Sequence, residues 1–94
     1  MEELLEEKED IKQDIALYRG QLQTALNDDR RKELKLALKI ARLELEINGY
    51  KIELENAATY EEKQRLSDLI NKARDTLHDL NVQLQQKRSS GKSI

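Results

Sequence analysis

Cysteine, proline, tryptophan and phenylalanine are all absent from this 94-residue chain, and its three tyrosines are its only aromatic residues. Without cysteine the chain can form no disulfide and offers no thiolate for catalysis, which favours the cytoplasm or another reducing intracellular compartment. Few aromatic residues and many charged ones are typical of long helices that meet along leucine and isoleucine seams, and not of an α/β domain.

Neither charge sign dominates, although 38% of the residues are charged. The formal net charge of −2 gives no general attraction to nucleic acid. No apolar run approaches the roughly 20 residues that a membrane-spanning helix needs. We therefore expect one small all-α domain over residues 1–88, and a disordered tail over 89–94, where the helical periodicity is lost.

The segment 33–55 has more apolar surface than a single helix seam can bury. At about 100° per residue its apolar side chains form two stripes on opposite sides of a helix. The first stripe contains Leu36, Ile40, Leu43, Ile47, Tyr50 and Leu54. The second contains Leu34, Leu38, Ala41, Leu45 and Ile52. Both sides must be covered, so the pattern predicts that this helix is a middle layer.

Two polar stripes separate the apolar ones. One contains Lys35, Lys39, Arg42, Glu46, Gly49 and Glu53, and the other contains Glu33, Glu44, Asn48, Lys51 and Glu55. The same alternation also fits an α+β alternative, in which residues 43–54 form a β-hairpin that turns at Asn48-Gly49. The helix is favoured because the segment is rich in Leu, Glu, Lys and Ala, and because the chain offers no further strand for a hairpin to pair with.

A helix carrying one apolar seam is expected on each side of the middle one, with approximate bounds of 2–26, 30–55 and 60–87 for the three. The first seam contains Leu4, Ile11, Ile15, Tyr18, Leu22 and Ala25. The third helix has its seam at Leu66, Ile70, Ala73, Leu77, Leu80 and Leu84. Three helices joined by short connections predict an antiparallel, up-down-up, elongated coiled-coil-like bundle.

Capping residues mark both connections. Asn27 is suited to a left-handed C-cap of the first helix, and Asp28 or Asp29 to the N-cap of the second. Thr59 and Glu62 have the spacing of a capping box, which predicts a helix that begins at Tyr60.

Opposed stripes are not what a triangular bundle needs, since its middle helix contacts both neighbours on adjacent sides. They indicate either a flat arrangement or one stripe that binds a partner, and they favour self-association as a homodimer or higher assembly. The candidate partner-binding residues are Leu34, Leu36, Leu38, Leu43, Leu45, Ile47 and Ile52.

Charge is also unevenly distributed along the expected bundle. One end collects Arg30, Arg31, Lys32, Lys35, Lys87 and Arg88. The other collects Glu2, Glu3, Glu6, Glu7, Glu53, Glu55, Glu61 and Glu62. Antiparallel or head-to-tail association would bring opposite signs together. The alternative is that these charges are solvated faces that complement the helix dipoles.

No motif for catalysis, cofactor or metal binding is present. His78 is the only histidine, and with Asp75 it makes a poor metal site. The carboxylate pairs cannot be told apart as acid and base, so we expect no enzyme, no cofactor and no small-molecule substrate.

The function expected is therefore a protein–protein interaction or oligomerisation module, whose partner is a second copy or a partner helix in a groove. In size, helix order and charge the chain also resembles BAG domains, three-helix co-chaperones that contact a chaperone through charged faces of two helices. That resemblance implies an adaptor as the alternative. Nucleic-acid binding through Arg30, Arg31 and Lys32 is a third hypothesis, against which the overall acidity weighs.

Overall fold

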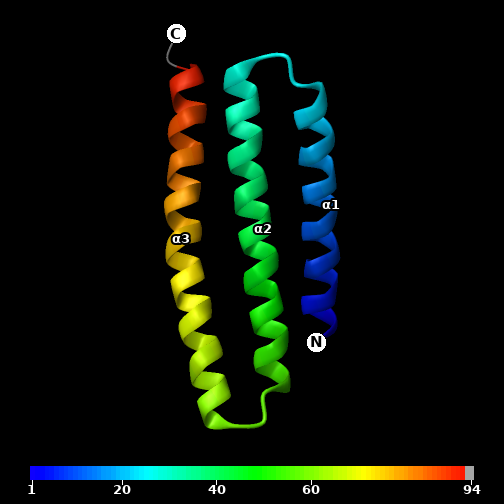
Figure 1. Ribbon diagram of the computed structural model, residues 1–94, viewed down its shortest axis with the longest axis vertical. Coiled ribbons are helices and arrows are strands. Elements are labelled where there is room, and N and C mark those ends of the chain that lie inside the picture. The colour runs from blue at the N-terminus through cyan, green and yellow to red at the C-terminus, as the bar shows by residue number, and fades with distance from the viewer. Residues whose placement is uncertain (93–94) are drawn as a thin grey trace.

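Three helices make up the computed structural model, which describes residues 1–92. They are α1 (Glu2–Thr24), α2 (Asp28–Asn56) and α3 (Tyr60–Lys92). Figure 1 shows them side by side, with α2 in the middle and running opposite to its two neighbours. The predicted all-α fold of three helices is confirmed.

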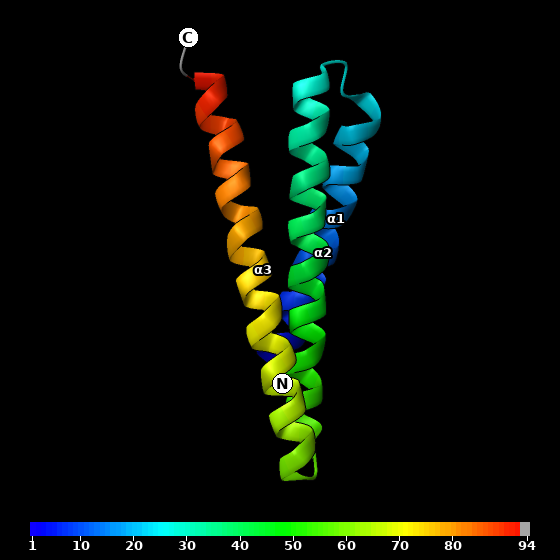
Figure 2. The same ribbon diagram turned by 60° about the vertical axis from the view of Figure 1, so that its left-hand side comes forward.

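The helices form a single layer and not a triangular bundle. The molecule measures 53 × 23 × 17 Å along its principal axes, and the shortest of these runs across the layer, down the line of view of Figure 1. α2 packs against both α1 and α3, whereas α1 and α3 do not pack against each other within residues 1–92. In Figure 2 α3 is inclined to α2, so the layer is twisted. Of the two arrangements that the opposed stripes allowed, the structure has the flat one.

The core runs along both sides of α2. On one side Leu36 and Ile40 pack with Leu84 of α3, and Leu77 and Leu80 border this cluster. The second stripe lies on the opposite side, against α1. The buried residues of α2 are Leu34, Leu36, Ala37, Leu38, Ile40, Ala41, Ile47 and Asn48. The middle helix therefore provides most of the core, as its two apolar stripes predict.

The connection between α1 and α2 differs from the prediction. Asn27 has a φ of −100° and is the N-cap of α2, with its Oδ1 accepting from the amides of Asp29 (2.7 Å) and Arg30 (3.4 Å). The left-handed cap expected at Asn27 and the N-cap expected at Asp28 or Asp29 were both wrong. An asparagine side chain caps as well as a carboxylate, and this register puts both aspartates in the first turn, where the helix dipole favours negative charge.

The second connection agrees with the prediction. The Glu62 amide donates to the Thr59 hydroxyl at 3.2 Å, which is one of the two hydrogen bonds of the predicted capping box; the described residues show no return bond from the Glu62 side chain. Between the two connections α2 is helical throughout, so residues 43–54 do not form the alternative hairpin. The described glycines include none with a positive φ, which an Asn48-Gly49 hairpin turn would require.

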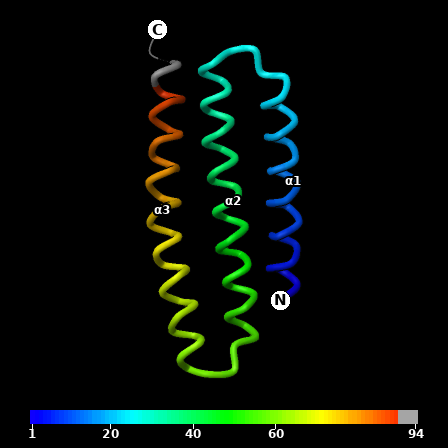
Figure 3. The backbone as a smooth tube through the Cα atoms, viewed as in Figure 1, coloured from blue at the N-terminus to red at the C-terminus, as the bar shows by residue number. Residues whose placement is uncertain are grey.

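The helix bounds shift by a few residues from those expected. α1 ends at Thr24, α2 begins at Asp28, and α3 continues to Lys92. Figure 3 traces this course from one terminus to the other. Residues 89–92 of the expected tail are thus helical, since no proline stops α3 after its last seam residue. Residues 93 and 94 of that tail lie outside the described part of the chain.

Candidate functional site

The seven residues predicted to bind a partner lie inside the chain's own layer. Leu34, Leu36, Leu38 and Ile47 are 2–7% exposed. The other three, Leu43, Leu45 and Ile52, are half-buried. α3 covers the first stripe and α1 the second, so neither stripe is left open as a partner seam. Three of the seven, Leu36, Leu38 and Leu43, line grooves on the surface, so the partner-binding role of these residues stays a prediction.

The two polar stripes of α2, which look alike in sequence, have different environments. The stripe with Lys35, Lys39, Arg42, Glu46, Gly49 and Glu53 is exposed at every residue except the half-buried Gly49. We call it the exposed stripe. The opposite one includes the fully buried Asn48 and the half-buried Glu33, Glu44 and Lys51. One broad face of the layer therefore presents α2 to solvent.

A groove of about 540 Å³ opens on this face. Leu22 of α1 and Leu36 and Leu38 of α2 supply its apolar lining. Its cations come from α2 and α3 and are Lys32, Lys35, Lys39, Arg42 and Lys87. A smaller groove of about 310 Å³ shares Lys39 and Arg42 and is also lined by Leu43, Glu46, Thr76 and Leu80. We call the larger one the basic groove.

The five cations of the basic groove have no partners of opposite charge among the described residues. Among residues 1–89, whose side chains the structure describes, the ion pairs are Met1–Glu55, Lys12–Glu9, Arg30–Glu33 and Arg88–Glu33. Five unneutralised positive charges around an apolar lining attract an anionic surface that also brings apolar groups.

Half of the predicted basic end is engaged in holding the fold. Arg30 and Arg88 both contact the Glu33 Oε1 atom, at 3.2 and 3.1 Å, and so link the start of α2 to the end of α3. Arg31 donates from Nε to the Ala25 oxygen at 3.0 Å, which satisfies a carbonyl beyond the end of α1. The remaining members of that cluster, Lys32, Lys35 and Lys87, line the basic groove.

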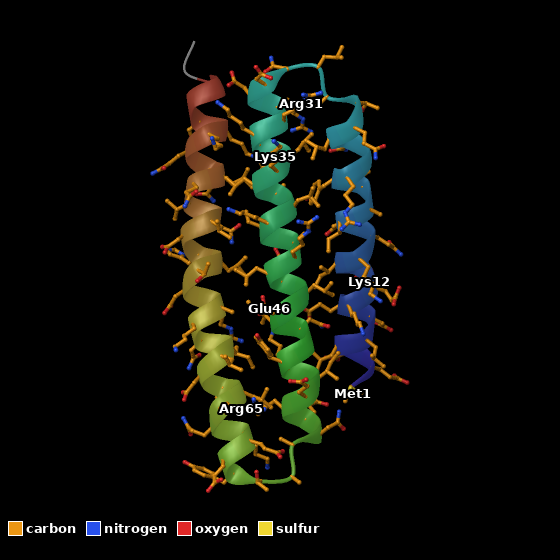
Figure 4. The ribbon with its side chains drawn as sticks, viewed as in Figure 1. Met1, Lys12, Arg31, Lys35, Glu46 and Arg65 are labelled. Atoms are coloured by element: carbon orange, nitrogen blue, oxygen red, sulfur yellow. The ribbon has the colours of Figure 1, made fainter. Side chains whose placement is uncertain are left out.

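The exposed stripe changes sign along α2. Lys35, Lys39 and Arg42 occupy its first half, and Glu46 and Glu53 its second. Figure 4 labels Lys35 near the start of α2 and Glu46 farther along it. The Tyr50 hydroxyl donates to Glu46 Oε1 at 2.6 Å, and this bond raises the pKa of Tyr50. The face thus combines a basic half and an acidic half.

The opposite polar stripe holds the half-buried Glu44 and the fully buried Asn48. Burial raises the pKa of Glu44, and the carboxylates of Asp14 and Glu7 raise it further. Asn48 donates from Nδ2 to the Leu4 oxygen at 2.8 Å, while its Oδ1 accepts no hydrogen bond from any described residue. Neither group could be singled out in the sequence, because burial on a polar stripe depends on how α1 leans over α2.

The described part of the chain contains neither a cluster of metal ligands nor a membrane-spanning helix. Within residues 1–92 no three His, Asp or Glu side chains are grouped as a metal site. His78 is exposed on α3. In the same part of the chain no helix has the length and apolarity that crossing a bilayer requires.

No protein-family model matches the chain, and no curated protein or solved structure matches it significantly. Function has to be inferred from the geometry and charge of the broad face.

Proposed function

We propose that this chain is a non-enzymatic protein–protein interaction module that binds an acidic helical surface on its broad face, at the basic groove. The observation that carries the proposal is the set of five cations around an apolar lining, none of which is neutralised by another described residue. The fold provides a rigid support, since the groove draws on all three helices.

The chemistry of the groove fits an amphipathic helix with acidic flanks. Leucines of the partner would contact mainly the half-buried Leu22, since Leu36 and Leu38 are only 7% and 5% exposed, while its carboxylates would face the lysines at the rim. Exposed ion pairs of this kind contribute mainly to association rate and specificity, and salt weakens them. The binding expected is therefore moderate in strength and salt-dependent.

A synthetic amphipathic peptide of glutamate and leucine tests this proposal. In ¹⁵N NMR titration of the whole chain we expect the largest shifts at the backbone amides around Lys35, Lys39 and Gln83. The double substitution Lys39→Glu, Arg42→Glu should weaken binding at least about tenfold. Arg74→Glu, on the exposed surface of α3 outside both grooves, is the control for charge reversal. Equal losses in the groove variant and the control would contradict the proposal.

The adaptor alternative has one observation in its favour. Both apolar stripes of α2 are covered within the chain, so the fold does not need a second molecule to bury its core. A monomeric adaptor would bind through the same exposed charges.

A duplex RNA competitor in the peptide assay tests the third hypothesis, nucleic-acid binding through Arg30, Arg31 and Lys32. If RNA displaces the peptide, and Arg30→Glu and Arg31→Glu abolish this displacement, nucleic acid is favoured over protein as the partner.

A further inference from the structure

The charges of the exposed stripe are arranged symmetrically about the middle of α2, with opposite signs on the two sides. Lys35 and Glu53 lie nine residues to either side of position 44, and Arg42 and Glu46 lie two residues to either side. We propose that the acidic helical surface bound on the broad face is the same face of a second copy of this chain, in an antiparallel dimer. This inference rests on the proposed interaction function and names its partner.

A two-fold axis through the level of position 44 pairs opposite charges. With a rise of about 1.5 Å per residue, antiparallel copies of α2 bring Lys35 of one copy level with Glu53 of the other. Arg42 becomes level with Glu46 in the same way. Each pairing occurs twice, because an isologous interface uses the same patch on both copies. A parallel pair would instead place Lys35 beside Lys35 and Glu53 beside Glu53, which repel.

The remaining members of the stripe also fit this register. Lys39 and Gly49 each lie five residues from position 44, so a lysine on one copy faces a glycine on the other. A Cβ built on Gly49 meets nothing within 4 Å, so there is open space beside this backbone. A lysine side chain can lay its aliphatic part along such a surface while its ammonium group stays in water.

The two connections provide a further match that does not depend on charge. Leu26 is 99% exposed and Tyr60 is 79% exposed, the highest values among the large apolar residues of the described chain. Leu26 precedes α2 and Tyr60 follows it, so they lie at opposite ends of the layer (Figure 1). An antiparallel pair brings Leu26 of one copy to the level of Tyr60 of the other, where each can cover the other's apolar surface.

The broad face is large enough for a stable interface. A face of 53 by 23 Å has a larger area than the about 800 Å² that each partner buries in an interface of standard size. Apolar contact is available at the half-buried Leu22, Leu43 and Leu80, which line the two grooves beside α2 between the charged residues. The charges would set the register, and the leucines would contribute the hydrophobic burial.

A charge-exchange experiment by sedimentation equilibrium tests the dimer. Lys35→Glu and Glu53→Lys, made singly, should each weaken dimerisation at least about tenfold, because each puts like charges opposite one another. The double variant restores opposite charges and should recover the wild-type dissociation constant to within about threefold. The control is Arg74→Glu with Asp79→Lys on α3, which exchanges charges outside the stripe and should leave the dimer unchanged. Circular dichroism on each variant checks that the helices are retained.

Two outcomes would overturn the inference, and they are distinguishable from failure of the proposed function. This register is ruled out if the single substitutions leave the dissociation constant of the dimer unchanged. It is also ruled out if the double variant does not recover the wild-type dissociation constant. A chain that stays monomeric yet binds the glutamate–leucine peptide has the proposed function with a different partner. A chain that neither dimerises nor binds the peptide overturns both proposals.

Discussion

Asn48 of α2 donates a hydrogen bond from its Nδ2 to the backbone oxygen of Leu4 in α1, at 2.8 Å, although its side chain is fully buried. The apolar contacts on this side of α2 are non-directional and would by themselves tolerate a shift of α1 along α2. Other polar contacts here, such as Met1–Glu55 at 3.5 Å, lie at the surface. A buried polar group with one available partner fixes the register, as single asparagines do in coiled coils.

Substitutions of Asn48 test whether its hydrogen bond fixes the position of α1 along α2 without adding to the free energy of unfolding. Asn48→Leu removes the hydrogen bond but also removes Oδ1, which has no partner among the described residues. We expect the free energy of unfolding to stay within about 1 kcal/mol of wild type in urea denaturation, while the NMR signals of α1 broaden. Asn48→Asp would bury an unpaired carboxylate and should cost several kcal/mol at neutral pH. A large loss for the leucine variant as well would contradict this account.

Glu44 gives the fold a defined pH dependence. Its pKa is raised in the folded chain, first by burial and then by Asp14 and Glu7, so the folded state takes up a proton more readily than the unfolded state. The carboxylate therefore lowers stability at neutral pH, and this effect disappears below the ordinary value of 4.5.

Glu44→Gln should accordingly raise the free energy of unfolding near pH 7 by no more than about 1 kcal/mol, since solvent screens this half-buried group. Below the ordinary pKa of Glu44 the two proteins should unfold alike. Asp79→Asn, on the exposed surface of α3, is the control for removing one negative charge from the chain. A larger benefit for Glu44→Gln at acidic pH than at neutral pH would contradict the assigned direction.

Gly49 lies in the interior of α2 with open space beside it. Gly49→Ala should stabilise the fold by about 0.5–1 kcal/mol in thermal unfolding, because alanine has the higher helix propensity. Gly20→Ala in α1, where an added Cβ also meets nothing, should give a similar gain. In a hairpin that turned at Asn48-Gly49, alanine would be strained, so destabilisation at this site alone would favour the hairpin.

The N-cap of α2 distinguishes Asn27 from the two aspartates that follow it. Asn27→Ala removes the acceptor for two backbone amides and should cost about 1 kcal/mol in urea denaturation. Asp28→Ala and Asp29→Ala should each cost less, since those carboxylates lie within the first turn and act through the helix dipole. A larger loss at Asp28 or Asp29 than at Asn27 would place the cap one or two residues later.

Much of the fold could be predicted from the sequence because apolar spacing alone specifies which sides of each helix are buried. The opposed stripes of residues 33–55 predicted a middle helix, and the flat layer follows from their separation of roughly 180°. The N-cap of α2 was harder to predict, since Asn27, Asp28 and Asp29 are all suitable N-cap residues. Which of them caps the helix depends on whether the helix begins one residue earlier or later.

The sequence contains less information about the candidate site than about the fold, and the partner-binding role of the seven predicted residues stays a prediction. Leu34 and Leu38 looked available for a partner because the periodicity shows that a stripe needs covering and does not show what covers it. The difference between the two polar stripes depends on the side toward which α1 and α3 lean. The one signal that could have found the site was already in the sequence, in the sign change between Arg42 and Glu46 along one stripe.

The most direct test of the central claim is the distance between spin labels on two copies of the chain. The absence of cysteine allows a single label at Asp28→Cys or at Asn56→Cys, which are exposed and lie outside the stripe. For an antiparallel dimer centred at position 44, helix rise predicts that the two labels at position 28 are roughly 50 Å apart and those at position 56 roughly 37 Å apart. Similar short distances at both positions would indicate a parallel pair and would contradict the account.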